Sequence, residues 1–280
     1  MEILSILWQP SKEVFTIGSF SLHWYSFFWC VGLIAAYIIV YKLYKAQSIP
    51  QRQFDPLFFY CFIGILIGAR LGHCLLYEPG YFLSHPVEML LPVRETGTGW
   101  KCTGYAGLAS HGGTIGLMIA LWLYVRRTKI NIFRVLDNIA IATPITACCI
   151  RLGNLMNSEI VGKYTGTDYG FIFACNGDLL PRHPGQLYEA VAYFVFFLVG
   201  LWLYRRDRVG TGFFFGWCLT AIFAFRFFVE FFKDVQEAWE IQMVNTIGLN
   251  QGQLLSIPFV AIGLYCLLGG KLCKKWGEKK

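Results

Sequence analysis

The chain has 280 residues, of which 56% are hydrophobic and only 15% are charged, and its mean hydropathy is +0.50. Soluble domains carry about 25% charged residues, so this composition excludes most of them and is typical of an integral membrane protein. The net charge of +7 would suggest nucleic acid binding in a soluble protein. Here the basic residues form short clusters between apolar runs, so no nucleic acid partner is expected.

Apolar runs of nearly membrane-spanning length follow one another along the chain. A transmembrane helix needs about 20 apolar residues, with a range of roughly 17–25. Membrane helices tolerate the glycines and prolines within these runs where backbones approach closely. We therefore predict an all-α integral membrane protein, a polytopic bundle of about seven transmembrane helices that forms a single membrane-embedded domain over residues 1–280. The runs cover about 24–44, 57–77, 108–125, 135–152, 187–204, 213–232 and 254–270.

Basic residues favour alternate connections between the runs, and lysine and arginine accumulate in cytoplasmic loops. The connections after the second, fourth and sixth runs are poorer in cations and include the longest loops, about 78–107 and 153–186. This alternation predicts that the N-terminus lies outside, that the C-terminus lies in the cytoplasm and that the long loops lie on the outer side. Basic pairs that carry the argument are Lys42 and Lys45, Arg126 and Arg127, Arg205 and Arg206, and Lys279 and Lys280.

Ionisable residues within membrane spans are costly, and they are candidates for function. The predicted direction of the helices brings those of this chain toward the outer leaflet. Arginines cannot be discharged and bind phosphate bidentately, while a histidine exchanges a proton near neutral pH. These residue types at that depth predict a phospholipid headgroup as ligand. The candidates are the ionisable residues Arg70, His73, His111, Arg151, Arg226 and Glu230, together with the polar residue Asn154 beside Arg151.

Structural alternatives exist for several of these residues. Arg226 and Glu230 are four residues apart and could form an ion pair within one helix. His111 precedes two glycines and could cap a helix entrance. Arg70 could extend its side chain toward the interface. The residues alone leave these alternatives open.

Seven short motifs resemble one family, the bacterial prolipoprotein diacylglyceryl transferases. RLGNLMNSEIVG at 151–162 resembles the family signature R-x-G-N-(2)-N-x-E-(2)-G, and RHPGQLYEA at 182–190 resembles its R-H-P-(S)-Q-L-Y-E segment. The matches come in family order and cover the chain from about residue 20 to 265. The others are HWY at 23–25, GARLG at 68–72, HGG at 111–113, RFFVEFF at 226–232 and GQLLSIP at 252–258.

The resemblance implies an enzyme of the bacterial cytoplasmic (inner) membrane. It would transfer the diacylglyceryl group of phosphatidylglycerol to the thiol of the lipobox cysteine in a prolipoprotein signal peptide. The products would be a thioether and glycerol phosphate, as the first step of lipoprotein maturation. The implied partners are phosphatidylglycerol, the prolipoprotein and the surrounding membrane lipid, and the resemblance implies neither a cofactor nor a metal.

Roles for individual residues follow from the same resemblance. His111 would be the general base that deprotonates the thiol, because a thiol with a pKa of about 8.5 is mostly protonated at neutral pH. Arg151 and Arg226 would bind the phosphate and stabilise the charge that develops on it as it leaves.

The remaining candidates would bind or orient the substrate. Hydrogen bonds from the loop after residue 151 would orient the headgroup and the arginines, and a glycine at 162 would permit a turn that a side chain obstructs. For the two asparagines, a network that merely stabilises the loop is the structural alternative. The substrate-binding set comprises Arg151, Tyr25, Asn154, Asn157, Glu159, Gly162 and Arg70.

Other classes of function fit the residues less well. A transporter or channel also gathers buried charges, but its polar residues would continue to the inner surface, where this chain has little beyond Asp137 and Asn138. A structural scaffold would not need basic residues at phosphate depth. The motifs G-x-S-x-G and H-E-x-x-H of hydrolases are absent from the sequence. Cys102 and Cys175, the cysteines of the outer loops, are hypothesised to form a disulfide.

Overall fold

The computed structural model describes residues 5–18, 20–91, 93–96, 99–102, 107, 109–204, 208–234 and 238–277. The chain divides into two compact units. Unit 1 comprises residues 1–43 and 133–280, and unit 2 comprises residues 44–132. Most of the described chain is helical, and the predicted basic residues Arg205, Arg206, Lys279 and Lys280 lie outside the described part.

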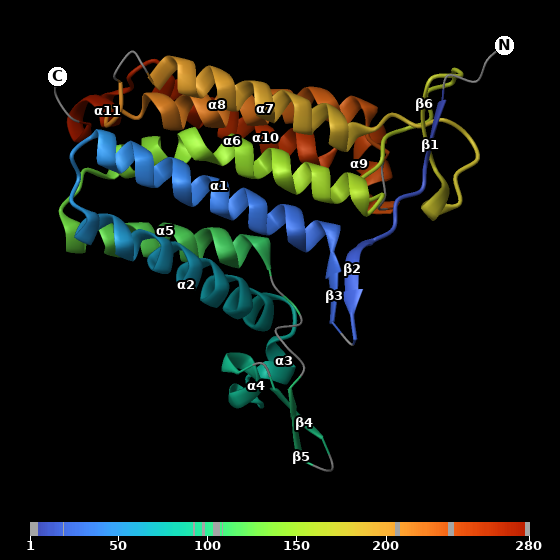
Figure 1. Ribbon diagram of the computed structural model, residues 1–280, viewed down its shortest axis with the longest axis horizontal. Helices are drawn as coiled ribbons and strands as arrows, with labels where there is room; N and C mark the ends of the chain where they lie inside the picture. Colours follow the sequence, from blue (N-terminus) through green and yellow to red (C-terminus); the bar gives the residue numbers. More distant parts are fainter. Residues whose placement is uncertain are drawn as a thin grey trace. The chain divides into compact units, whose positions relative to one another are not determined.

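Long apolar helices make up most of unit 1 (Figure 1). Within this unit, α8 packs against both α7 and α10. The first of the helices, α1, approaches α6 at Gly32, where the Thr146 hydroxyl donates a hydrogen bond to the Gly32 carbonyl at 3.1 Å. The bounds are α1 (Trp24–Ala46), α6 (Ile132–Met156), α7 (Gly185–Tyr204), α8 (Phe213–Val229), η2 (Glu230–Phe232), α9 (Ala238–Ile247), α10 (Gln251–Leu267) and α11 (Lys271–Trp276).

A buried carboxylate joins two of these helices. Asp137 of α6 is fully buried, and its Oδ2 accepts hydrogen bonds from the backbone N–H groups of Gly210 and Gly212 at 2.8 and 3.0 Å. Its Oδ1 accepts a third from Phe215 at 2.9 Å. These are donors at the N-terminal end of α8, which would otherwise lack partners within the helix. Asp137 therefore caps α8 from the neighbouring helix.

Short strands precede α1 and follow α6. β1 (Ser5–Trp8) pairs in parallel with β6 (Gly170–Phe173), and β2 (Glu13–Ile17) pairs antiparallel with β3 (Phe20–His23). A 3-10 turn, η1 (Ala174–Asn176), follows β6. The Trp8 indole donates to the Leu155 carbonyl at 2.9 Å and lies 5.4 Å from the Phe171 ring, so β1 and β6 are fixed on the end of α6.

Unit 2 is built on two closely packed helices, α2 (Gln51–Leu76) and α5 (Ser110–Thr128). Between them the chain forms α3 (Pro79–Phe82), α4 (Pro86–Leu90) and a hairpin of β4 (Val93–Thr96) with β5 (Gly99–Cys102). Glycines let the two helix backbones meet. A Cβ on Gly72 would lie 2.7 Å from the Gly112 Cα, and one on Gly64 would lie 2.8 Å from the Gly116 carbonyl oxygen. Close approach of this kind is how small residues join membrane helices.

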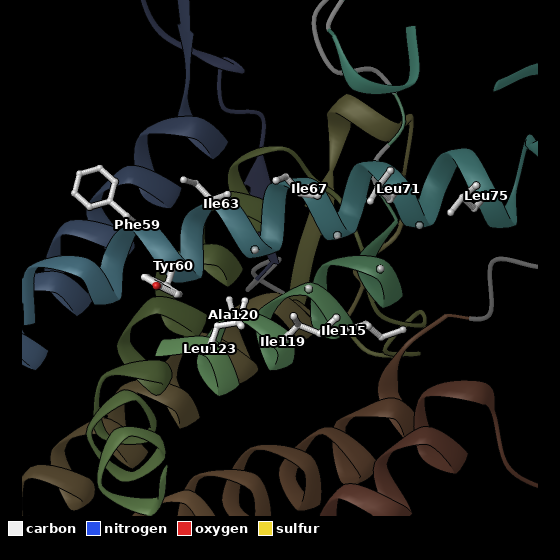
Figure 2. Close-up of a pocket in the computed structure, with 15 residues that line it drawn as sticks. Phe59, Tyr60, Ile63, Ile67, Leu71, Leu75, Ile115, Ile119, Ala120 and Leu123 are labelled. Carbon is white, nitrogen blue, oxygen red and sulfur yellow. The ribbon is translucent and has the colours of Figure 1, made fainter. Parts of the chain in front are cut away.

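An apolar groove of about 650 Å³ runs along α2 and α5, and Figure 2 shows side chains of both helices on its walls. Ile63 and Ile67 of α2 and Ile115 and Ile119 of α5 are all about half exposed or more. The groove is therefore a surface of unit 2 rather than an enclosed cavity. Its floor is the glycine contact, made by Gly64, Gly68, Gly72, Gly112 and Gly116.

Replacement of Gly68 by valine is expected to destabilise the protein by about 1–3 kcal/mol, because the added carbons must fit where the α5 backbone lies. A Cβ on Gly68 would collide with the Gly112 carbonyl and lie 2.8 Å from the Gly116 Cα. Thermal unfolding in detergent, followed by tryptophan fluorescence, measures the effect. Gly80→Ala is the control, since nothing lies within 4 Å of its Cβ position. Equal melting temperatures of the two variants would contradict the packing argument.

The helices agree with the predicted apolar runs, because most residues of each run belong to one helix. Five of the described helices, α1, α2, α6, α7 and α8, are long and apolar enough to cross a membrane. The runs 108–125 and 254–270 correspond to α5 and to the shorter apolar helix α10. The chain is thus a mostly helical, multi-pass membrane protein, while a total of seven spans and the single domain stay predictions.

Candidate functional site

The end of α6 carries Arg151, whose side chain is 14% exposed and whose guanidinium contacts two partners. Its Nε lies 3.0 Å from Glu189 Oε2, and its Nη1 donates to Asn154 Oδ1 at 3.2 Å. Asn154 in turn donates to Glu159 Oε2 at 3.2 Å, and Asn157 donates to Glu159 Oε1 at 3.1 Å. The structure therefore brings together four of the residues that the first motif singled out.

The turn after α6 has an unusual backbone. Ser158 and Ile160 both have positive φ angles, 56° and 57°, and a β-branched residue rarely adopts this conformation. Two side chains hold the turn in place: Asn176 donates to the Ser158 carbonyl at 2.8 Å, and Gln186 donates to the Glu159 carbonyl. Such backbone strain persists where its surroundings fix it, and it concentrates at functional sites.

Gly162 lies where three motif segments meet. Its N–H donates to the His183 carbonyl at 2.9 Å, and the segment also pairs with Lys233 through a β-bridge. A Cβ here would lie 2.5 Å from the His183 oxygen and 2.7 Å from the Phe232 oxygen. A side chain is indeed obstructed, as predicted. The cause differs from the predicted turn, because Gly162 is not among the glycines with positive φ and the obstruction comes from backbone packing.

Two buried residues without a predicted role complete the surroundings of Arg151. Glu189 of α7 is fully buried, and Lys233 is 5% exposed. Lys233 Nζ lies 3.3 Å from Glu189 Oε2 and donates to Glu230 Oε1 at 2.9 Å. Glu189 Oε2 meets both cations at ion-pair distance without hydrogen-bond geometry. The sequence did contain a signal for Glu189, because it is a carboxylate within the apolar run 187–204 and charges at such depth are rare.

Arg226 lies on the same network through Glu230. Its Nε is 3.7 Å from Glu230 Oε1, so the ion pair considered as an alternative is present, although Lys233 binds the same oxygen more closely. Glu230 Oε2 accepts a hydrogen bond from Asn250 at 3.1 Å. The Arg226 side chain is 39% exposed, whereas Glu230 is 9% exposed. The carboxylate that contacts Arg226 is thus buried, whereas the Arg226 side chain itself is accessible.

Tyr25 also lies near the end of α6. A Cβ on Gly153 would be 3.1 Å from the Tyr25 ring and 3.2 Å from its Cα, so α1 begins against the residue two positions after Arg151. A glycine at 153 allows this approach without a shift of Tyr25. The structure therefore brings Tyr25 to the same part of unit 1 as Arg151 and Asn154.

Arg182 belongs to a separate cluster beside the loop. It forms ion pairs with Asp178 at 2.9 Å and Asp234 at 2.8 Å, and it lies over the Tyr164 ring. Burial opposes the charge of Arg182, but the hydrogen bonds to Asp234 and Asp178 outweigh this cost and raise its pKa. These contacts tie residues 164, 178, 182 and 234 together, which indicates a structural role.

The other predicted residues, His111 and Arg70, belong to unit 2. His111 is exposed in the first turn of α5, and within the described part of the chain it forms no hydrogen bond or ion pair. The residue before α5 is Ala109, so the alternative that His111 caps this helix is wrong. Arg70 is buried and donates to the carbonyls of Glu88 at 2.6 Å and Met89 at 3.2 Å. Arg70 thus anchors α4, and its substrate role stays a prediction.

The polar residues at the other end of α6 do not form a path. Both Asp137 oxygens accept hydrogen bonds from backbone donors at the start of α8 and just before it, and Asn138 donates to the Arg134 carbonyl at 2.8 Å. Cys175 is a free thiol in this structure, so the hypothesised disulfide is not formed in it, and the side chain of Cys102 lies outside the described part.

Among the described residues, no cluster of three or more His, Cys, Asp or Glu side chains could hold a metal ion.

Comparison with known proteins shows which family the sequence matches. The sequence model of the family described as prolipoprotein diacylglyceryl transferase matches residues 12–268. A phosphatidylglycerol–prolipoprotein diacylglyceryl transferase of Bacteroides fragilis is 58% identical over 94% of both chains. Proteins of the same name from Tolumonas auensis and Porphyromonas gingivalis are 42% and 41% identical over 94% of this chain and over 96% and 94% of their own.

Proposed function

We propose, given that this chain belongs to the prolipoprotein diacylglyceryl transferase family, that it transfers the diacylglyceryl group of phosphatidylglycerol to a prolipoprotein. The acceptor is the thiol of the lipobox cysteine in the signal peptide. The thiol sulfur forms a bond to the terminal glyceryl carbon as the bond from that carbon to the phosphate oxygen breaks. The electron pair stays on the phosphate, which leaves as glycerol phosphate, and the lipobox cysteine becomes a thioether.

The observation that carries this proposal is the pair of arginines on one charge network. Arg151 and Arg226 are each held at Nε by a glutamate, at 3.0 and 3.7 Å, which leaves terminal nitrogens for a ligand. A guanidinium binds phosphate through such donors. In this role the arginines hold the headgroup and stabilise the second negative charge of the leaving phosphate.

Other residues have supporting roles in the proposal. His111 accepts the proton of the attacking thiol, which its exposed side chain leaves it free to do. Asn154, Asn157 and Glu159 orient Arg151 and the headgroup, and Tyr25 contacts the substrate near the end of α6. Gly162 keeps the loop after α6 against residues 183 and 232.

We further propose that the helices α1, α2, α5, α6, α7, α8 and α10 all span the bacterial inner membrane, with the N-terminus outside and the C-terminus in the cytoplasm. The alternation of basic connections supports this orientation. With this orientation Arg151 and Arg226 both lie toward the outer leaflet, where phosphatidylglycerol would present its phosphate.

The test is a reaction with purified components. Enzyme in detergent receives phosphatidylglycerol and a lipobox peptide, and glycerol phosphate release is followed together with the mass of the peptide. The expected result is a peptide heavier by one diacylglyceryl group, with equal amounts of glycerol phosphate. A peptide with serine in place of cysteine is the control and should stay unmodified. An unmodified cysteine peptide, under conditions in which the Bacteroides fragilis relative modifies it, would contradict the proposal.

A further inference from the structure

Glu189 is the most deeply buried charge near Arg151. Its side chain is 0% exposed, and it is the only charged residue of α7. Oε2 is 3.0 Å from Arg151 Nε and 3.3 Å from Lys233 Nζ, while Oε1 accepts a hydrogen bond from the Tyr193 hydroxyl at 3.0 Å. A buried carboxylate is costly unless it is paired, so this one is retained with its two cations.

The charges alternate in sign from one arginine to the other. In order they are Arg151, Glu189, Lys233, Glu230 and Arg226, with contacts of 3.0, 3.3, 2.9 and 3.7 Å between neighbours. The three central members are at most 9% exposed. The two ends are more accessible, at 14% and 39%. A rigid, buried centre thus connects two arginines that come from α6 and α8.

Both arginines keep guanidinium nitrogens that are available to a ligand. Arg151 uses Nε for Glu189 and Nη1 for Asn154, and its Nη2 donates no hydrogen bond to the described residues. Arg226 contacts Glu230 through Nε, and its terminal nitrogens likewise donate none within the described chain. Fixing a planar guanidinium on one side orients its remaining donors, which is what bidentate phosphate binding needs.

We propose that Glu189 and Lys233 are positioning residues that set the distance and orientation of Arg151 relative to Arg226, so that both bind one phosphate group. The inference rests on the proposed function, because that phosphate is the headgroup of the lipid donor. Glu189 orients Arg151 directly. Lys233 joins the two glutamates, which would repel each other without a cation between them.

The first variant is Glu189→Gln, which keeps the shape of the side chain and removes its charge. It is expected to lower kcat/KM for phosphatidylglycerol about 100-fold, as a misplaced catalytic group does. Glu189→Asp, which keeps the charge at a shorter reach, should recover part of that loss. Asp234→Asn is the matched control, because it removes a neighbouring carboxylate that pairs with Arg182 instead. Its kcat/KM should stay within about threefold of wild type.

A double variant separates positioning from stability. Glu189→Gln with Lys233→Met removes one charge of each sign, so the cluster keeps the net charge of wild type, and the variant should recover part of the melting temperature that Glu189→Gln alone loses. If Glu189 positions Arg151, kcat/KM stays low in the double variant. If activity returns with the melting temperature, or if Glu189→Gln retains kcat/KM within about threefold, the inference is wrong.

Failure of the inference is distinguishable from failure of the proposed function. An inactive wild-type enzyme contradicts the function, whereas an active wild type with active charge variants contradicts only the positioning role. Should Glu189→Gln fail to fold, the charge-balanced double variant carries the test by itself, and wild-type kcat/KM in that variant overturns the inference.

Discussion

Replacement of Arg151 by lysine is expected to lower kcat/KM for phosphatidylglycerol about 1,000-fold, the scale of losing a donor that stabilises transition-state charge. Arg151 places Nε beside Glu189 and Nη1 beside Asn154 and still has a further nitrogen for the phosphate. Lysine has one nitrogen for all three partners. Its positive charge still pairs with Glu189, so the protein should fold. Initial rates of glycerol phosphate release over a range of lipid concentrations measure the loss.

Arg182→Lys is the matched control for this prediction. Arg182 also holds two acidic partners, at 2.9 and 2.8 Å, but all of its contacts bind the loop together. Its replacement should lower the melting temperature and leave kcat/KM within about fivefold of wild type. Equal losses of kcat/KM in the two variants would mean that disruption of the loop, and not loss of phosphate binding, lowers the activity. If kcat/KM falls only slightly in Arg151→Lys, then Arg151 does not bind the phosphate.

The helices were predictable because their signal is local. The run 135–152 lies on Ile132–Met156, and the run 187–204 lies on Gly185–Tyr204. Hydropathy missed the last turn of α6, residues 153–156, because that turn contains Gly153 and the polar Asn154, which are still helical. The strands were not predicted, since each has four or five residues and β1 finds its partner β6 about 165 positions away.

The candidate site was predicted where it is contained in one motif and missed where it depends on packing. Residues 151–159 are close in sequence, and their hydrogen bonds follow from spacing on one helix end. Glu189 and Lys233 meet because α7 and the turn after α8 lie together, which no local pattern encodes. For the same reason, the sequence suggested only an ion pair between Arg226 and Glu230 within one helix. In the structure Glu230 also contacts Lys233 and Asn250.

His111→Gln is expected to lower kcat for transfer about 1,000-fold near neutral pH, because glutamine cannot accept the proton of the thiol. The melting temperature and the binding of phosphatidylglycerol should not change. His111 is exposed in the first turn of α5 and forms no hydrogen bond or ion pair with the described residues, so its removal breaks no contact of the fold. Single-turnover rates with saturating lipid and lipobox peptide measure the chemical step.

The dependence on pH separates a general base from other roles. Without the base, transfer must begin from peptide that is already a thiolate, and below the thiol pKa of about 8.5 that fraction rises tenfold per pH unit. The rate of His111→Gln should therefore climb steeply with pH, while the wild-type rate climbs less because the enzyme removes the proton itself. A variant that stays equally slow at high pH would contradict the role as base. A variant that binds phosphatidylglycerol poorly would instead place His111 with the headgroup.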